Sequence, residues 1–459
     1  FGWADNNSKF IVGDREISVD GVYHSPPSSV TKDLAERMGP SGTYEKWQEV
    51  FSLYGRPGLE PHAFAALAGF GAPLFKFTGQ SGAILNLIHP KSGTGKTTIL
   101  HMCNSIWGHP KDLCAVKGDT PNAKTMHLGL MNNLPFTVDE ITNMTAIQLS
   151  EMAYNMSQGR GKNRMKSSSN ELRMNTTTWQ TISLCSSNAS FYEKLGTLKG
   201  NPDGEMMRLL EYKIGYSDAI PTDHAKEMFD HQLLNNYGYA GPIFIEWVLK
   251  NLEEVKNTLK VVQMKIDREL KLTQRERFWS AAVAAIITGG MIARRLKIID
   301  WDMKRIYEWA CGIIVETRKD VEAPLEPSAS ALGDYLNRHI NNILVINDKV
   351  DTRSNMDPYP VMEPRGELRI RFEPDTKRLF VDYKHFREDC AKMQVNFKEF
   401  IKELEKRGAL VRCGSKRMSK GMKINTTPIY VMELDTTVGD FIDVEELLPE
   451  EVAESEDAG

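Results

Sequence analysis

A glycine-rich loop followed by lysine and threonine gives the chain its first chemical signature. Residues 89–98 read HPKSGTGKTT and fit the phosphate-binding pattern G-x-x-x-x-G-K-[ST], except that Pro90 replaces the first glycine. Such a loop turns backbone N–H groups toward phosphates at a helix N-terminus, where the helix dipole also favours anions. Proline at its entrance removes one such donor. The residues expected to bind ATP are Gly93, Thr94, Gly95, Lys96, Thr97 and Thr98.

Two adjacent acids follow a second apolar stretch, residues 134–140, which reads LPFTVDE. Asp139 is expected to hold Mg²⁺ together with the Thr97 hydroxyl, and Glu140 to polarise the attacking water. Separate roles for the two carboxylates favour hydrolysis over phosphoryl transfer to a substrate. Alone, an Asp-Glu pair is often only a solvated strand end. Its occurrence after a phosphate-binding loop predicts catalytic roles for Lys96, Asp139 and Glu140.

Two further polar residues follow in the order that a ring ATPase needs. Asn188 ends the strand-like run 181–188 and is expected to orient the same water or contact the γ-phosphate. Arg208 lies near the start of the next segment, from which an arginine finger can enter a neighbouring subunit's site. The alternatives are a turn-forming asparagine and a surface arginine.

Residues 159–173 form a basic segment between these motifs. Glycines and serines separate five cations within it, which predicts a hairpin that grips the phosphate backbone of nucleic acid without reading sequence. The alternative is a solvated loop. The residues expected to contact DNA here are Arg160, Lys162, Arg164 and Lys166.

The C-terminal part carries a second basic patch and an acidic end. Seven cations and no acid occur between Lys406 and Lys423, after a helical stretch 396–407, which is the outline of a winged-helix domain. Arg417 and Lys420 on its wing are expected to contact DNA, although such modules also serve as protein contacts. Residues 439–459 hold nine acids and no base. This tail is expected to be disordered and either to mimic DNA for a primase, polymerase or single-strand binding protein, or only to add solubility.

Composition narrows the class of protein. The chain has 459 residues, 41% hydrophobic and 26% charged, which predicts a globular protein of about two to four domains. Its six cysteines show no metal-ligand spacing, so we expect no structural metal and a reducing cytoplasm, that of a host cell if the source is a phage. The longest apolar run, residues 278–293, is too short to span a membrane and predicts a buried helix.

Alternating strand and helix patterns predict an α/β fold, with a P-loop ATPase core of the AAA+ type, a helical region and a winged-helix-like domain. A compact apolar strand, 82–88, is expected directly before the phosphate-binding loop. The expected divisions are an N-terminal strand and helical region 1–81, the ATPase core 82–222, a helical region 223–321, a linker 322–330, the winged-helix-like domain 331–438 and the acidic tail 439–459.

The order of loop, acidic strand, basic hairpin, Asn188 and Arg208 resembles the core of superfamily 3 helicases, a branch of the AAA+ ATPases. More narrowly, residues 1–3 (FGW), 10–14 (FIVGD), 159–164 (GRGKNR), Trp179 and 236–241 (NYGYAG) resemble the family called domain of unknown function 927, found in phage and plasmid proteins. The resemblance covers roughly residues 1–300. It implies a ring, usually hexameric, that hydrolyses ATP to move along nucleic acid.

The leading hypothesis is therefore an ATP-driven, ring-forming replicative helicase that translocates on single-stranded DNA and acts on forked DNA. It could be the motor part of a phage primase-helicase, because the chain begins in mid-pattern at Phe1. The alternative is an ATP-dependent initiator or loader that binds DNA without translocating. A small-molecule P-loop kinase is a third hypothesis, which would leave both basic segments without a role.

Overall fold

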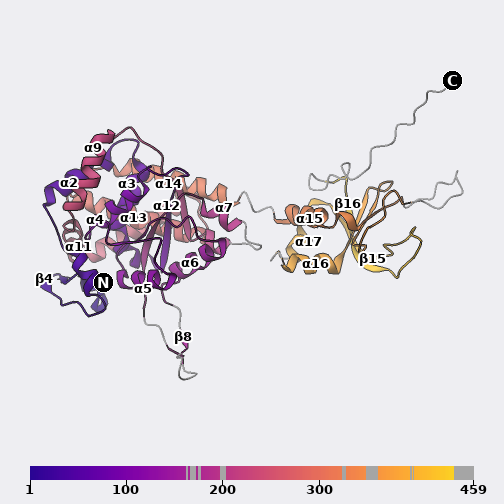
Figure 1. The fold of residues 1–459 in the computed structure, drawn as a ribbon, viewed down its shortest axis with the longest axis horizontal. Helices are drawn as coiled ribbons and strands as arrows, with labels where there is room; N and C mark the ends of the chain where they lie inside the picture. The colour runs from indigo at the N-terminus through magenta and orange to yellow at the C-terminus, as the bar shows by residue number, and fades with distance from the viewer. Residues whose placement is uncertain are drawn as a thin grey trace. The chain divides into compact units, whose positions relative to one another are not determined.

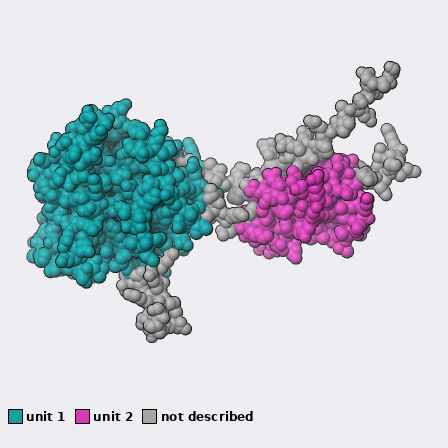
Figure 2. Space-filling model, in the orientation of Figure 1, with its two compact units in different colours: residues 1–198, 202–322 teal, residues 199–201, 323–459 magenta. Residues whose placement is uncertain are grey.

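A computed structural model describes residues 1–161, 164–165, 172–173, 177–196, 203–322, 327–347, 360–392, 395 and 397–438. The chain folds as two compact units, coloured separately in Figure 2, and the division falls after Glu322. The first unit contains the phosphate-binding loop. The second contains the basic segment near residue 417.

The first unit is organised around a five-stranded parallel sheet with the order β11-β5-β10-β7-β6. All of β5, β7 and β10 is apolar or buried, as expected of strands that are covered on both faces. Because β10 lies between β5 and β7, the segments that follow these three strands meet at one edge of the sheet. The strands are β5 (Gly82–Ile88), β6 (Cys114–Ala115), β7 (Phe136–Val138), β10 (Thr181–Ser187) and β11 (Leu209–Lys213).

Helices pack around this sheet (Figure 1), and the α/β fold predicted from the sequence is confirmed. Helix α3 (Glu60–Phe75) is buried from His62 to Phe75 and packs against α4 (Lys96–Ser105), β10 and α13 (Arg277–Arg295). The other helices of this unit are α1 (Lys32–Ala35), α2 (Tyr44–Ser52), α5 (Pro121–Met131), α6 (Ala146–Gln158), α7 (Phe191–Gly196), α8 (Asp203–Met206), α9 (Thr222–Lys226), the π-helix Glu227–Gln232, α10 (Leu233–Asn235), α11 (Ala240–Lys250), α12 (Leu252–Leu270) and α14 (Met303–Glu322).

An antiparallel sheet of four short strands begins the chain, as the alternating pattern there predicted. Its strands are β1 (Gly2–Ala4), β2 (Lys9–Val12), β3 (Arg15–Ser18) and β4 (Gly21–His24), paired in chain order. The indole N–H of Trp3 donates to the carbonyl of Pro73 at 2.8 Å, which attaches this sheet to the end of α3.

The apolar run 278–293 forms the buried part of α13, as predicted. Glycines on both helices allow α13 to approach α3 so closely that backbone meets backbone. A Cβ atom on Gly289 would lie 2.8 Å from the carbonyl carbon of Phe70, and one on Gly71 would lie 2.8 Å from the Cα of Ile286. Among the described residues, no helix is both long and apolar enough to cross a membrane.

The second unit holds a five-stranded sheet with the order β12-β13-β14-β16-β15, flanked in sequence by three helices. Helix α17 leads directly into the β15–β16 hairpin, as the predicted helix and hairpin required. Strand β12 was not predicted; it pairs in parallel with β13 and extends the sheet. The elements are α15 (Pro327–Arg338), β12 (Ile343–Val345), β13 (Ile370–Glu373), β14 (Arg378–Asp382), α16 (Tyr383–Lys392), α17 (Phe397–Arg407), β15 (Leu410–Lys416) and β16 (Ile429–Asp435).

Part of the expected linker, 322–330, is helical. Helix α14 ends at Glu322 and α15 begins at Pro327, so residues 327–330 form the first turn of a helix. Proline suits that position, because the first N–H groups of a helix have no intrahelical acceptor. The proline and small-residue composition that suggested a linker is thus also that of a helix start.

We predict that Gly289→Ala destabilises the first unit by about 1–3 kcal/mol, because the added methyl group would push α13 away from the backbone of α3. The midpoint of urea unfolding measures this. Gly312→Ala in α14 is the matched control, since nothing lies within 4 Å of its Cβ position. That change should leave stability equal or slightly raised. Equal stability of the two variants would contradict the close packing.

Candidate functional site

A pocket of about 500 Å³ opens where β5 and β10 end. It receives side chains from the phosphate-binding loop, from the segments after β7 and β10, and from helices that lie far away in sequence. Its lining residues include Ser92 to Thr98, Glu140, Ser186, Asn188, Tyr54, His62, Tyr216, Phe229 and Asp230. All six residues predicted to bind ATP therefore line one pocket.

The loop has the backbone that phosphate binding requires. Gly93 and Gly95 have φ angles of 77° and 89°, and Gly95 stands directly before the first residue of α4. Residues with a side chain rarely adopt such backbone angles, which explains why glycine occupies both positions. Thr94 is 5% exposed, and its Oγ1 has no hydrogen-bond partner among the described residues. A buried hydroxyl without a partner at a helix N-terminus fits a phosphate ligand.

Lys96 is held inside this loop. Its Nζ donates to the carbonyls of His89 and Lys91, at 3.1 and 3.2 Å. Burial lowers the pKa of Lys96 below its ordinary value, while the carboxylates of Glu140 and Asp139 act in the opposite direction. The ammonium group therefore sits in a partly desolvated place, where attraction to an anion is stronger than in water.

Asp139 connects the loop to the centre of the sheet. The Thr97 hydroxyl donates to both oxygens of this carboxylate, each at 3.1 Å, and the Ser186 hydroxyl donates to its Oδ1 at 2.5 Å. Thr97 and Asp139 were predicted as Mg²⁺ ligands, and the structure places them side by side. A hydroxyl and a carboxylate are the oxygen ligands that Mg²⁺ prefers, so the donor set fits this ion.

Glu140 is fixed beside them by an unusual backbone. Its φ angle of 55° lies in the left-handed region, which is uncommon for any residue but glycine and is frequent at functional sites. Its N–H donates to the Ser186 hydroxyl at 2.9 Å. The Asn188 amide donates to Glu140 Oε2 at 3.3 Å. Lys96, Asp139, Glu140 and Asn188 are thus brought together as the sequence predicted.

The far wall of the pocket was not predicted. The ring of Tyr54 lies 5.5 Å from those of both His62 and Phe229, and makes an apolar wall beside the loop. His62 Nδ1 is buried without a hydrogen-bond partner among the described residues, and burial lowers the pKa of His62 to about 4. This imidazole is therefore neutral at pH 7. Such a wall suits a nucleobase, because a flat apolar face and a few polar atoms recognise it.

Two hydrogen bonds hold residues 215–222, the segment that lines the pocket beside this wall. Arg56 donates to the carbonyl of Ala219 at 2.6 Å, and the Tyr216 hydroxyl donates to the carbonyl of Ser92 at 3.2 Å. The π-helix 227–232 follows and presents Phe229 and Asp230 to the pocket. Single π-helical turns are often found at functional sites.

Arg208 lies elsewhere. Its guanidinium packs over the rings of Tyr154 and Phe278, at 5.4 and 5.3 Å, and it does not line the pocket of its own chain. Arg275 and Arg277, at the N-terminal side of α13, do not line it either. A role for Arg208 in a neighbouring subunit's site stays a prediction.

The basic segment 159–173 has the backbone of a hairpin. Strand β8 (Arg164–Met165) pairs antiparallel with β9 (Leu172–Arg173). Lys162, Lys166 and the side chain of Arg164 lie outside the described residues. At the base, exposed Arg160 bridges to Thr178, and the N–H of Trp179 donates to the carbonyl of Gly159 at 2.9 Å. The hairpin thus leads directly into β10.

We predict that Ser186→Ala lowers the rate of ATP hydrolysis about tenfold and raises the Mg²⁺ concentration for half-maximal activity, because Asp139 and Glu140 lose a shared hydroxyl. Steady-state hydrolysis at varied Mg²⁺ measures both. Ser187→Ala is the control, because the Ser187 hydroxyl donates to the carbonyl of Ala189 at 2.7 Å and accepts from the N–H of Ala189 at 3.2 Å. An equal Mg²⁺ requirement in the two variants would contradict the role of Ser186.

The chain is similar to one protein family and to solved structures. Residues 1–176 match the family model described as "Domain of unknown function (DUF927)". Comparison with curated protein sequences gives no match. A solved structure described as "SCCmec type IV Cch - active helicase" is similar over 95% of this chain and 78% of that one, with 17% identity and a TM-score of 0.61. A second, described as an inhibitor-bound JCV helicase, covers 55% of this chain and 66% of that one, with 8% identity and a TM-score of 0.26.

The first structural match extends across both units, because it covers nearly the whole chain. At this level of identity, the likeness concerns the fold. The family match covers residues 1–176, whereas the resemblance expected from the sequence extends to about residue 300. Residues 1–176 are therefore similar to the DUF927 family, and the chain has a fold similar to that of the solved structure described as an active helicase.

Proposed function

We propose that the chain is an ATP-driven, ring-forming replicative DNA helicase that translocates on single-stranded DNA. The observation that carries this proposal is the contact of Thr97 with Asp139 beside Glu140 and Asn188. These groups, placed around a phosphate-binding loop, are those that nucleotide hydrolysis needs. The fold likeness to a structure described as an active helicase supports the same reading.

The chain's own residues divide the work of hydrolysis. The loop N–H groups and Lys96 would bind the phosphates, while Thr97 and Asp139 would hold Mg²⁺, whose charge offsets that of the phosphates. Glu140 would orient and polarise the attacking water, and Asn188 would fix the position of Glu140 or of that water. The apolar wall of Tyr54 and Phe229 would hold the base away from solvent.

The basic hairpin is the proposed DNA contact. Its cations, Arg160, Lys162, Arg164 and Lys166, would bind successive phosphates, which suits an enzyme that must move without regard to sequence. A ring, with six subunits as the expected number, would place several hairpins around one strand. Arg208 would then act in the site of the next subunit.

A forked duplex with a single-stranded tail tests the proposal. With ATP and Mg²⁺ the chain should separate the strands, and Glu140→Gln should bind ATP and DNA but neither hydrolyse nor unwind. Hydrolysis that DNA does not stimulate, with no unwinding on forks of either polarity, would refute translocation. ATP-dependent assembly on DNA without unwinding would instead favour an initiator or loader.

We predict that the double variant Lys162→Ala/Arg164→Ala loses DNA-stimulated hydrolysis at least tenfold and keeps basal hydrolysis. Two phosphate contacts per subunit are removed, while the nucleotide pocket is untouched. Steady-state hydrolysis with and without single-stranded DNA gives both rates.

The double variant Lys260→Ala/Arg268→Ala is the matched control, because it removes the same charge from exposed positions on α12. It should behave as the parent chain. Equal loss of basal and stimulated rates in the hairpin variant would show that the hairpin does not act through DNA.

A further inference from the structure

The turn between β15 and β16 combines exposed cations with an exposed apolar side chain. Arg417, Lys420 and Lys423 are exposed, and no acid occurs from Lys406 to Met432. Ile424 follows and is 77% exposed, the highest value among the large hydrophobic side chains of the described residues. A single exposed apolar residue is common on protein surfaces. Ile424 differs because it lies in a basic turn whose backbone is fixed by the buried side chain of Arg371.

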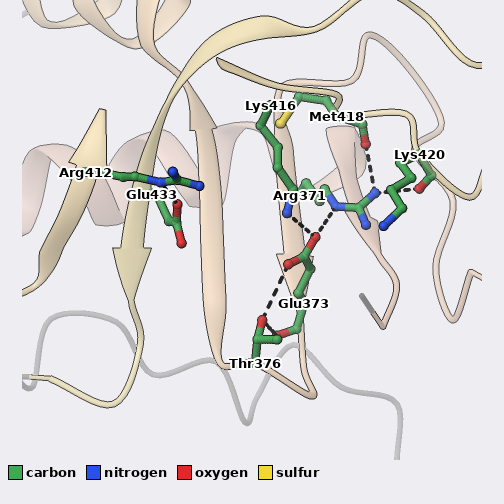
Figure 3. A network of polar contacts seen from close by, with 8 residues as sticks. All are labelled: Arg371, Glu373, Thr376, Arg412, Lys416, Met418, Lys420 and Glu433. Atoms are coloured by element: carbon green, nitrogen blue, oxygen red, sulfur yellow. Dashed lines mark hydrogen bonds and ion pairs between the residues drawn. The ribbon is translucent and has the colours of Figure 1, made fainter. Parts of the chain in front are cut away.

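Arg371 holds this turn. The side chain lies on β13 and is 1% exposed, and it donates to the carbonyls of Met418 and Lys420 at 3.1 and 2.6 Å. Its Nε donates to Glu373 at 2.7 Å (Figure 3). A buried guanidinium is stable only when its N–H groups find acceptors, so the positions of the two carbonyls are tied to Arg371.

Glu373 and Lys416 complete the support. Glu373 is 2% exposed and accepts from Lys416 Nζ at 2.8 Å, and the same ammonium lies 3.9 Å from the centre of the Phe380 ring. Lys416 is the last residue of β15, so this pair fixes the point at which the strand becomes the turn (Figure 3). Breaking such a buried pair is costly, because it leaves a charge without its partner.

The turn is also closed on itself. The Ser419 hydroxyl accepts from the N–H of Thr426 at 2.7 Å and lies 2.9 Å from the Thr426 hydroxyl. Both Met418 and Ser419 are 3% exposed. The segment between Ser419 and Thr426, which carries Lys420, Lys423 and Ile424, is therefore a short loop held at both ends.

We propose that this turn is a wedge for the end of a DNA duplex, in which Ile424 inserts against the terminal base pair while Arg417 and Lys423 bind the flanking phosphates. Arg371 is its positioning residue. Apolar side chains of this size insert between base steps in other proteins and unstack them. Such a wedge has to be rigid, because a loose loop would fold away rather than separate bases.

This proposal rests on the proposed helicase function, since a duplex end is what a translocating helicase meets. It adds an element that single-stranded DNA binding does not need. The wedge should therefore affect strand separation and base unstacking, and not the hydrolysis that single-stranded DNA stimulates.

A forked duplex with 2-aminopurine in the first base pair tests the wedge without ATP. Binding of the full chain should raise the fluorescence of this base, since the base becomes unstacked. Ile424→Ala should lose most of that rise and still bind the fork. Val411→Ala is the matched control, because Val411 is an exposed apolar residue on β15 outside the turn. An equal rise in both variants would overturn the proposal.

The positioning role is tested by Arg371→Lys, which keeps a positive charge beside Glu373 but lacks the planar guanidinium that serves three acceptors at once. We expect faster amide hydrogen exchange in residues 418–424 than in the rest of the β15–β16 hairpin, and the same loss of 2-aminopurine signal as in Ile424→Ala. Arg412→Ala controls for charge, since Arg412 pairs with Glu433 at 2.7 Å on the same hairpin. Unchanged exchange in Arg371→Lys would overturn its role.

Unwinding assays then separate this proposal from the general one. If the parent chain unwinds forks and Ile424→Ala does so with the same ATP consumption per base pair, only the wedge is refuted. If the parent chain hydrolyses ATP without unwinding, the helicase proposal falls, and the 2-aminopurine signal still decides whether the turn opens a duplex end.

Discussion

One carboxylate, that of Asp139, joins the parts on which the candidate site depends. It accepts hydrogen bonds from Thr97 on α4 and from Ser186 on β10. These contacts are possible only because β10 lies between β5 and β7 in the sheet. The strand order therefore sets the distance between the phosphate-binding loop and the acids. It also explains why Asn188, at the end of the intervening strand, reaches Glu140.

Local sequence was enough to predict the elements that carry the chemistry. The strand expected at residues 82–88 is β5 as observed, and those around Asp139 and Asn188 agree within a few residues. Each is a short apolar run with a polar end, a pattern that depends on neighbours in the chain. The expected linker was less successful, because Pro327 and the small residues after it are compatible with both a linker and a helix start.

The missed residues depend on contacts between distant segments. Tyr54, His62 and Phe229 meet only because α3 and the π-helix pack beside the loop, and no spacing in the sequence relates them. Ser186 was hidden because a serine in a buried strand is usually only a hydrogen-bonded core residue. Arg371 was hidden for a similar reason, since an arginine in a strand is expected on a solvated face, whereas it is buried here.

Strand β10 connects the base of the basic hairpin to the candidate site. The hairpin base, at Thr178 and Trp179, enters β10 at one end, and Asn188 follows the other. Seven residues of strand span about 23 Å. Because β10 is hydrogen-bonded to β5 along its whole length and to β7 across its middle, it cannot slide without breaking both sets of bonds. Strand β10 is therefore a rigid connection. The base of the hairpin and the Asn188 amide, which contacts Glu140, move together with the sheet.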